Sequence, residues 1–563
     1  MNIALFFTIF TWAIGGLVIL YSFSFLKNKR NKLLYFALYT LTLILATAAF
    51  NTNDLVQFLV YWGSLLILLY AVLALDSFKT ASKALIIVGI GDFCLLLGVA
   101  FLIVKAKTTS MADFIPLDTG NFINAAAFML IALGAMIKAG IFGFHEWITD
   151  ASQATPATTM AFLPGSLDKL LGIYLLLRAY LNFFTVRESL SVIIMAIGAF
   201  TIILTVFMAL IQHDLKKLLA FHAVSQVGYM VLGIASGTLI GIAGGLFHML
   251  NNAIYKTALF LNAGNIEHGT GTTELSKIGN LGKSMPVTFV CTLISALAIS
   301  GIPPFNGFFS KWMIYQGLIP DKAGAFGTFK IIFLIMAMFG SALTLASFIK
   351  VIYSAFLSSK PAEQAQDVQE APYLMRFAVI ILSGLCILFG VFAYPMIIKP
   401  FFVNIFSSEM TLTGLWKPDI ATGLILLALA IGCLIYALSR AASRSSEVFI
   451  GGETLKDNRV SGTDFYLTVQ DIGFLKFLYK KADAGKLDFY KTLISFINAA
   501  SYVFYYGIDR LMNFITNAAG KSVFVISAFL KSLHTGLLDR YVAWLLLGFI
   551  VIIGVLFKCL NCM

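Results

Sequence analysis

The chain has 563 residues, of which 60% are hydrophobic and only 12% are charged, and its mean hydropathy is +0.91. A soluble chain carries about 25% charged residues and a membrane span needs roughly 20 apolar residues, so the composition excludes a soluble globular protein and predicts an all-α polytopic membrane protein. The net charge of +12 lies largely in short loops, where it sets membrane orientation, and it does not indicate a nucleic-acid partner.

Apolar runs predict about fourteen transmembrane helices. They cover 3–26, 33–50, 55–75, 83–104, 121–143, 155–183, 188–211, 217–235, 237–263, 285–320, 329–357, 372–396, 420–438 and 541–559. The first run lacks a preceding basic segment and a cleavage site, so we expect a retained span rather than a signal peptide. The basic loop 27–32 (KNKRNK) predicts that the N-terminus lies outside the cell (inner) membrane and that this loop is cytoplasmic.

Two of these segments are predicted to be broken inside the membrane. Residues 121–143 run into FGFHEWITDASQATP, and 285–320 are interrupted at SGIPPFNGFF. Broken helices at membrane depth survive only where protein buries them or where they line a wet cavity, and a matching pair of interruptions points to a transport site. We therefore expect two inverted five-helix repeats, although the two halves show no clear sequence match.

The expected organisation has six parts. They are N-terminal transmembrane helices (1–54), a first half with a break near 138–156 (55–211), a second half with a break near 301–311 (212–360), accessory transmembrane helices (361–440), a cytoplasmic loop with a lateral helix (441–540) and a C-terminal transmembrane anchor (541–563). Residues 466–540 combine helical apolar spacing with frequent charges, which predicts an amphipathic helix lying along the membrane. If continuous it would reach on the order of 100 Å; Gly485, Gly507 and Gly520 leave several short surface helices as the alternative.

A few ionisable residues lie within the predicted spans: Asp92, Lys138, Asp168, Lys169, His248, Lys256 and Lys311. Each costs at least a few kcal/mol at bilayer depth unless it faces the bundle interior. Burial favours neutral lysine and a nearby carboxylate favours the charged form, so a lysine under both influences can bind and release a proton. His248, Asn252 and Lys256 are four residues apart and share one helix face as a polar strip.

The acidic partners of these lysines are assigned by residue type. Asp92 is the expected partner of Lys138 or Lys169, and neighbouring Asp168 and Lys169 point about 100° apart on a helix, so each is expected to pair with another helix. Lys350 lies near the end of its span and is expected to extend its amine to the membrane surface.

Five stretches occur in a defined order between about residues 55 and 360: GAMIKAGIFGFHEWITDA, KLLGIY, QHDLKKLLAFHAVSQVGY, HMLNNAIYK and GIPPFNGFFSK. This series resembles the antiporter-like subunits of respiratory complex I, of Mrp sodium/proton antiporters and of group 4 membrane-bound hydrogenases. The resemblance implies that protons move along a polar axis through Lys138, Lys169, His248, Lys256 and Lys311. It also implies that residues 466–540 correspond to the lateral helix of the large complex I antiporter subunit.

The sequence departs from the family pattern at three places. Trp62 is followed by Gly63 where the family has glutamate, so Lys138 lacks its usual partner and Asp92 or Asp168 is expected to replace it. Asn252 replaces a histidine, and Thr149 replaces a proline. The Trp-Gly pair and FLPGSLDKLLGIYLLLR most resemble the corresponding antiporter-like subunit of Ech-type energy-converting NiFe hydrogenases.

The resemblance implies a proton-translocating subunit of a redox-driven complex, with no catalytic centre, metal or cofactor in this chain. The expected partners are the lipid bilayer, other membrane subunits and, through them, iron–sulfur and NiFe hydrogenase-like subunits. The alternatives are an Mrp-type antiporter subunit, a large complex I subunit, or a structural scaffold whose buried charges stay paired. The sequence leaves H⁺ and Na⁺ open as the transported ion. The CxxC pair Cys559 and Cys562 is not expected to bind metal, because metal sites normally need four ligands.

Overall fold

The computed structural model describes residues 3–320, 325–358, 368–403, 473–483 and 488–560, with isolated positions between 423 and 438. These residues form two compact units, Met1–Tyr490 and Lys491–Met563. The predicted span at 420–438 and the loop that follows it lie largely outside the described residues. The predicted all-α membrane fold is confirmed, because the described residues include eleven helices long and apolar enough to cross a membrane.

The helices of the first unit are α1 (Ile3–Phe25), α2 (Lys32–Asn51), α3 (Leu55–Ala74), α4 (Phe78–Ala106), α5 (Phe122–Ala139), α6 (Glu146–Ala154), α7 (Ala157–Phe162), α8 (Asp168–Arg178), α9 (Glu188–Leu210), α10 (Leu215–Ala235), α11 (Leu239–Thr270), α12 (Leu281–Ser284), α13 (Pro286–Ser300), α14 (Asn306–Gly317), α15 (Ala325–Ile352), α16 (Tyr373–Val391) and α20 (Gly473–Asp483). Most helices of the first unit coincide with the predicted apolar runs; the short helices α6, α12 and α20 lie outside them. Two short parallel strands, β1 (Leu117–Asp118) and β2 (Phe184–Thr185), join two loops at one end of the bundle.

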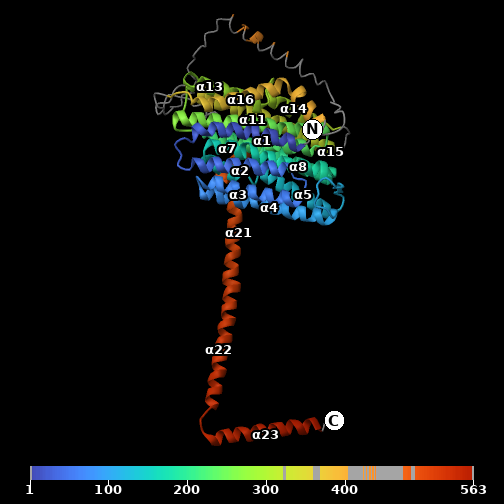
Figure 1. The fold of residues 1–563 in the computed structure, drawn as a ribbon, viewed down its shortest axis with the longest axis vertical. Helices are drawn as coiled ribbons and strands as arrows, with labels where there is room; N and C mark the ends of the chain where they lie inside the picture. The colour runs from blue at the N-terminus through green and yellow to red at the C-terminus, as the bar shows by residue number, and fades with distance from the viewer. Residues whose placement is uncertain are drawn as a thin grey trace. The chain divides into compact units, whose positions relative to one another are not determined.

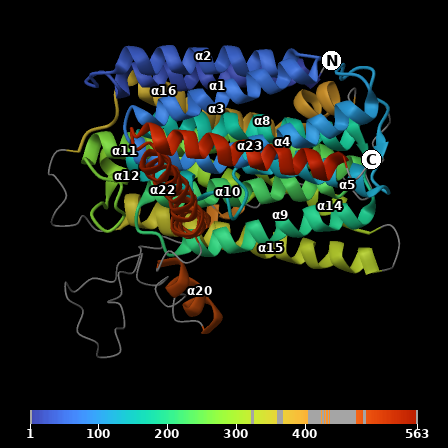
Figure 2. The ribbon, with the colours of Figure 1, turned by 90° about the horizontal axis from the view of Figure 1, so that it is seen from below.

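Helix α11 is the centre of this bundle. It packs against α10, α13, α14, α16 and α7, and Figure 1 shows it between the layer of α13, α14 and α16 and the layer of α7 and α8. Figure 2 shows α1 and α2 along one side of the bundle and α9 and α15 along the opposite side. The position of α11 buries 27 consecutive residues, Ile240 to Ile266, including every polar side chain among them. The polar side chains of α11 between Ile240 and Ile266 are therefore enclosed by the protein.

Both predicted breaks are present, and they have the same backbone form. Helix α5 ends at Gly140 (φ +89°) and α13 ends at Gly301 (φ +81°). In each case the N–H of the next residue reaches back five residues, from Ile141 to the Met136 carbonyl and from Ile302 to the Leu297 carbonyl, at 3.0 Å. This pattern defines a Schellman cap, whose left-handed position favours glycine. The same local signal ends both spanning segments.

An aspartate caps the first helix of each half. Asp54 accepts N–H groups at the start of α3, and Asp214 does the same for α10. Each aspartate also accepts a hydroxyl hydrogen bond from a threonine after the next helix, Thr109 for Asp54 and Thr273 for Asp214. The two halves of the bundle therefore share a scaffold that their sequences do not reveal.

The two aspartate caps lie at opposite ends of the bundle. Helix α3 runs away from Asp54, so α4 begins at the far end, where Lys83 contacts Asp150 of α6 at 3.0 Å. Gln153 of the same short helix donates to Asp214 at 2.8 Å. Asp214 consequently lies at the end opposite Asp54, which is the geometry that inverted halves require.

The segment from Ala157 to Phe183 is a span that is buried from Ala157 to Leu177 and contains two π-helical stretches. The first, η1 (Leu163–Leu167), includes Pro164 and immediately precedes Asp168 and Lys169. Proline lacks an N–H group and displaces the preceding turn of a helix, and π-bulges of this kind frequently accompany functional residues. The break in regular hydrogen bonding is therefore located beside two of the buried charges.

The amphipathic segment forms a shorter continuous helix than predicted. It runs through α21 (Phe489–Val503), the π-helical η6 (Phe504–Asp509) and α22 (Arg510–Leu533), about 70 Å at 1.5 Å per residue. Gly507 lies in the π-helical part, Gly520 does not interrupt α22, and Gly485 lies outside the described residues. The predicted C-terminal anchor is helix α23 (Leu538–Leu560), which is apolar enough to span a membrane.

A cluster of charges around the buried Lys83 includes Asp488, which precedes α21 within the first unit. Lys83 contacts Asp150 at 3.0 Å and Asp488 at 2.9 Å. The carboxylate of Glu146 accepts the N–H of Phe489 at 3.2 Å. Glu146 lies between two spans, and its burial, with the nearby charge of Asp488, raises its pKa from 4.5 to about 7, against the opposing effects of backbone hydrogen bonds and Lys83.

We predict that Glu146→Gln raises thermal stability increasingly as the pH rises from 4.5 to about 7. A carboxyl group whose pKa is raised in the folded state stabilises the fold while it is protonated, and this contribution is lost as the pH increases. The measurement is the thermal midpoint of the purified protein against pH. The control is Glu188→Gln, since Glu188 also opens a helix but is exposed; equal pH dependence in both variants would contradict the prediction.

Candidate functional site

Lys138 occupies the last turn of α5, beside the first break, and only 1% of its surface is exposed. Its Nζ lies 5.5 Å from the ring centroid of Trp62, within the range of a cation–π contact. The Trp62 Nε1 donates to Asp92 Oδ1 at 2.7 Å. Lys138 has no carboxylate within 4.0 Å among the described residues, but both Asp92 and Asp168 interact with it electrostatically. Trp62 thus contacts both Lys138 and Asp92.

Asp168 and Lys169 follow the π-helical stretch η1 and are buried. The Lys169 amine donates to the carbonyl oxygen of Pro164 within that stretch. Asp168 Oδ2 is buried and has no hydrogen-bond partner among the described residues. The two neighbours do not form an ion pair, in keeping with their different directions on the helix; Lys169 instead interacts electrostatically with both Asp168 and Lys256.

The polar strip of α11 is completely buried, and its three side chains bond to different neighbours. His248 Nδ1 lies 2.9 Å from the Ser310 hydroxyl, and His248 Nε2 lies 3.1 Å from Gln226 Oε1. Asn252 donates to the Gly165 carbonyl at 3.3 Å, and Lys256 donates to the Leu219 carbonyl at 2.9 Å. The strip therefore connects α11 to α10, α14 and η1 rather than forming one hydrogen-bonded chain.

Lys311 follows the second break and points back to it. Its amine donates to the carbonyl oxygens of Ile299 at 2.9 Å and Ser300 at 3.5 Å, and it lies 4.7 Å from the ring centroid of Tyr229. The last carbonyls of a helix have no partner within that helix and carry the negative end of its dipole. The end of α13 thus solvates a buried ammonium group without a carboxylate.

Lys350 was expected to extend its amine to the membrane surface; the residue is buried in the protein, with only 2% of it exposed. It donates to the carbonyl oxygens of Leu210 and Gln212, the latter at 2.9 Å, at the C-terminal end of α9. A helix end that packs beside α15 supplies these acceptors, so the side chain is solvated inside the protein.

Electrostatic interactions connect these groups in sequence across the bundle. Lys138 interacts with Asp168, Asp168 with Lys169, and Lys169 with Lys256. Beyond Lys256, the interactions continue through His222 to Lys311, which also interacts with His248. We name this series the buried charge line: Asp92, Lys138, Asp168, Lys169, Lys256, His222, Lys311 and His248.

Sequence reasoning missed His222 of this line, and it missed Gln226 and Ser310, which contact His248. His222 and Gln226 are four residues apart, so they share one face of α10. Every residue of that helix except Lys217 is buried, which leaves its polar side chains no route to solvent. The four-residue spacing of His222 and Gln226 within QHDLKKLLAFHAVSQVGY was therefore the sequence signal that could have identified them. The contact of Ser310 with α11 depends on tertiary packing.

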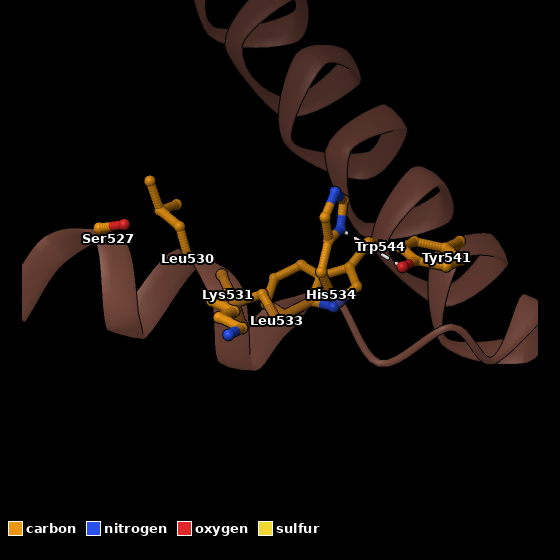
Figure 3. A pocket seen from close by; sticks show the side chains of 7 residues that line it. All are labelled: Ser527, Leu530, Lys531, Leu533, His534, Tyr541 and Trp544. Atoms are coloured by element: carbon orange, nitrogen blue, oxygen red, sulfur yellow. Dashed lines mark hydrogen bonds between the residues drawn. The ribbon is translucent and has the colours of Figure 1, made fainter.

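Other site types find no support in the described residues. No group of three or more His, Cys, Asp or Glu side chains there is arranged to hold a metal ion. A hollow at the corner between α22 and α23 is lined by Lys531, His534, Tyr541 and Trp544, among others (Figure 3). It shares no residue with the buried charge line.

A polytopic helical bundle with two broken helices and a buried line of lysines defines the class as an ion-transport fold. The chain belongs to the family described as NADH:quinone oxidoreductase/Mrp antiporter, TM, whose model matches residues 52–344. Both breaks and the whole buried charge line fall within that match.

Two curated relatives illustrate the family. The chain is 33% identical to a Na(+)/H(+) antiporter subunit of Alkalihalophilus pseudofirmus over 418 residues, which cover 69% of this chain and 52% of the relative. It is also 33% identical to hydrogenase-4 component B of Escherichia coli over 318 residues, covering 53% of this chain and 47% of the relative. The chain thus spans about half the length of these relatives.

The fold also resembles that of a solved chain. The solved chain belongs to a structure described as that of the membrane-bound sulfane sulfur reductase (MBS), an archaeal respiratory membrane complex. The TM-score is 0.71 with 22% identity, and the match covers 98% of this chain and 88% of the other. The two chains therefore share a fold.

We predict that Trp62→Phe lowers the free energy of unfolding by about 1–3 kcal/mol, because it leaves Asp92 buried without its hydrogen-bond donor. The measurement is the thermal midpoint of the purified protein. Trp12→Phe is the matched control, since Trp12 Nε1 also donates a hydrogen bond, to Thr47, but the residue is 42% exposed. An equal loss in the two variants would mean that Asp92 does not depend on Trp62.

Proposed function

We propose that this chain is a proton-translocating, antiporter-like subunit of a larger membrane complex. The observation that carries the proposal is the buried charge line, in which Lys169, Lys256 and Lys311 are solvated by main-chain carbonyl groups. A carboxylate in direct contact strongly favours the charged form of a lysine. A carbonyl oxygen accepts a hydrogen bond from the ammonium group but adds no net charge, so each of these lysines can lose its proton at a lower cost.

The proposed mechanism is electrostatic. A proton that leaves one lysine removes a positive charge from the neighbourhood of the next, which favours protonation there. Lys169 and Lys256 interact in this way, with Asp168 as a counter-charge on one side only. Protonation of one lysine therefore alters protonation of the next. The helix breaks at Gly140 and Gly301 supply the polar backbone through which water and protons enter.

The host complex is proposed to be redox-driven, of the Ech-type ferredoxin-linked NiFe hydrogenase class. Support comes from the similarity to hydrogenase-4 component B and from the fold match to a respiratory complex over 98% of the chain. The second candidate is a component of an Mrp-type Na⁺/H⁺ antiporter, which the identity to the antiporter relative supports equally. In either host, the partners are other membrane subunits, and the proposed location is the cell membrane with the N-terminus outside.

We predict that Lys256→Ala lowers proton translocation at least about tenfold, equivalent to ~1.4 kcal/mol on the barrier, because it removes a titratable group from the centre of the line. The measurement is proton uptake by vesicles that contain the native complex. Lys283→Ala is the control, since Lys283 is exposed. If Lys256→Ala assembles normally and transports at the unchanged rate, the scaffold alternative replaces the proposal.

The identity of the host complex is tested by purifying the complex through an affinity tag on this chain. We predict that iron–sulfur and nickel-containing subunits co-purify and that proton uptake requires reduced ferredoxin. A complex without metal that exchanges Na⁺ for H⁺ in vesicles would instead assign the chain to an Mrp-type antiporter.

A further inference from the structure

His222 is a fully buried histidine near the centre of the bundle. It lies on α10, and its Nε2 is 2.8 Å from the hydroxyl oxygen of Ser347 on α15. Its Nδ1 is buried and has no hydrogen-bond partner among the described residues. A buried ring nitrogen without a partner is costly, so a role other than packing is needed to explain it.

The surroundings of His222 are cationic and aromatic. Its ring packs against Phe348 with centroids 4.9 Å apart, and the Lys256 amine lies 5.9 Å from the centroid of the same ring. Lys256, Lys350 and Lys311 all interact electrostatically with the histidine, and no carboxylate among the described residues does so. His222 and Lys256 therefore contact the same aromatic ring, and both Lys256 and Lys311 act electrostatically on the histidine.

Lys256 and Lys311 have no direct link of their own. The amine of Lys256 donates to Leu219, and that of Lys311 donates to Ile299 and Ser300. The imidazole of His222 is the titratable group that interacts with both. A neutral imidazole accepts a proton on one ring nitrogen and releases one from the other, which is the chemistry that this gap requires.

The inverted halves place His222 in a defined position. It lies eight residues after Asp214, as Trp62 lies eight residues after Asp54. Lys256 lies 17 residues before Thr273, as Asp92 lies 17 residues before Thr109. The Trp62–Asp92 pair of the first half, whose indole cannot exchange a proton, therefore corresponds to a His222–Lys256 pair in the second half.

We propose that His222 is a proton-relay residue between Lys256 and Lys311. The inference rests on the proposed function and adds a residue to its path. A proton leaves the Lys256 ammonium group and binds the free Nδ1, and the Nε2 proton then leaves toward Lys311 through the Ser347 hydroxyl, which both accepts and donates. Exchange of the ring proton from Nδ1 to Nε2 restores the starting tautomer, and no net charge remains on the ring.

The test is proton uptake by vesicles that contain the native complex with His222→Gln. We expect a decrease of about tenfold, together with a larger solvent isotope effect in deuterium oxide, because the proton transfer that remains becomes rate-limiting. His268→Gln is the matched control, since His268 lies on α11 but is exposed, and it should leave both quantities unchanged.

A second variant separates a relay from a packing role. His222→Ala opens a cavity that free imidazole can fill, so added imidazole should restore proton uptake in this variant and not in Lys256→Ala. Loss of uptake that imidazole does not restore, with an unchanged isotope effect, would overturn the relay. Normal uptake by His222→Gln alongside an inactive Lys256→Ala would overturn only this inference, whereas normal uptake by both would overturn the proposed function.

Discussion

The solvation of buried ammonium groups is the constraint on which the rest of this structure depends. A lysine at bilayer depth costs several kcal/mol unless polar groups surround it, and an α-helix uses nearly all of its own carbonyl groups. The fold supplies free acceptors by interrupting its helices. Lys311 bonds to the end of α13 at the second break, and Lys169 bonds to the π-helical stretch around Pro164. The irregular backbone thus provides the carbonyl groups that solvate the buried lysines.

The inverted halves provide one scaffold for two different sets of charges. In the first half, Asp92 and Asp168 accompany Lys138, and Trp62 contacts both Asp92 and the lysine. In the second half, the charge line consists of lysines and histidines. Under the proposed mechanism, carboxylates partly compensate a change of charge in the first half, while a change in the second half acts on the next basic group. Shared backbone geometry with different side chains therefore gives the halves different electrostatic responses.

The sequence predicts the fold in outline because membrane spans depend on composition and length, which are local properties. The breaks were also predictable, since Gly140 and Gly301 adopt left-handed conformations that favour glycine. The contacts of the buried charges were not predictable. His222 needed the packing of α10 against α15 to acquire its partner Ser347, and the acceptors of Lys350 at Leu210 and Gln212 come from another helix. Spacing identifies the face of a helix, but it does not identify what that face meets.

The distribution of ion pairs distinguishes a transport path from a scaffold. Among the described residues, ion pairs within 4.0 Å occur near helix ends and in loops, as in Lys29–Asp76, Lys216–Glu267 and Arg187–Asp118. No such pair includes Lys138, Lys169, Lys256 or Lys311, although all four are almost completely buried. A scaffold would be expected to neutralise interior charges by direct pairing, since an unpaired buried charge is strongly destabilising. A bundle that pairs its charges at the ends and leaves those of the interior unpaired retains groups whose protonation can change, and this property is useful to a protein that moves protons.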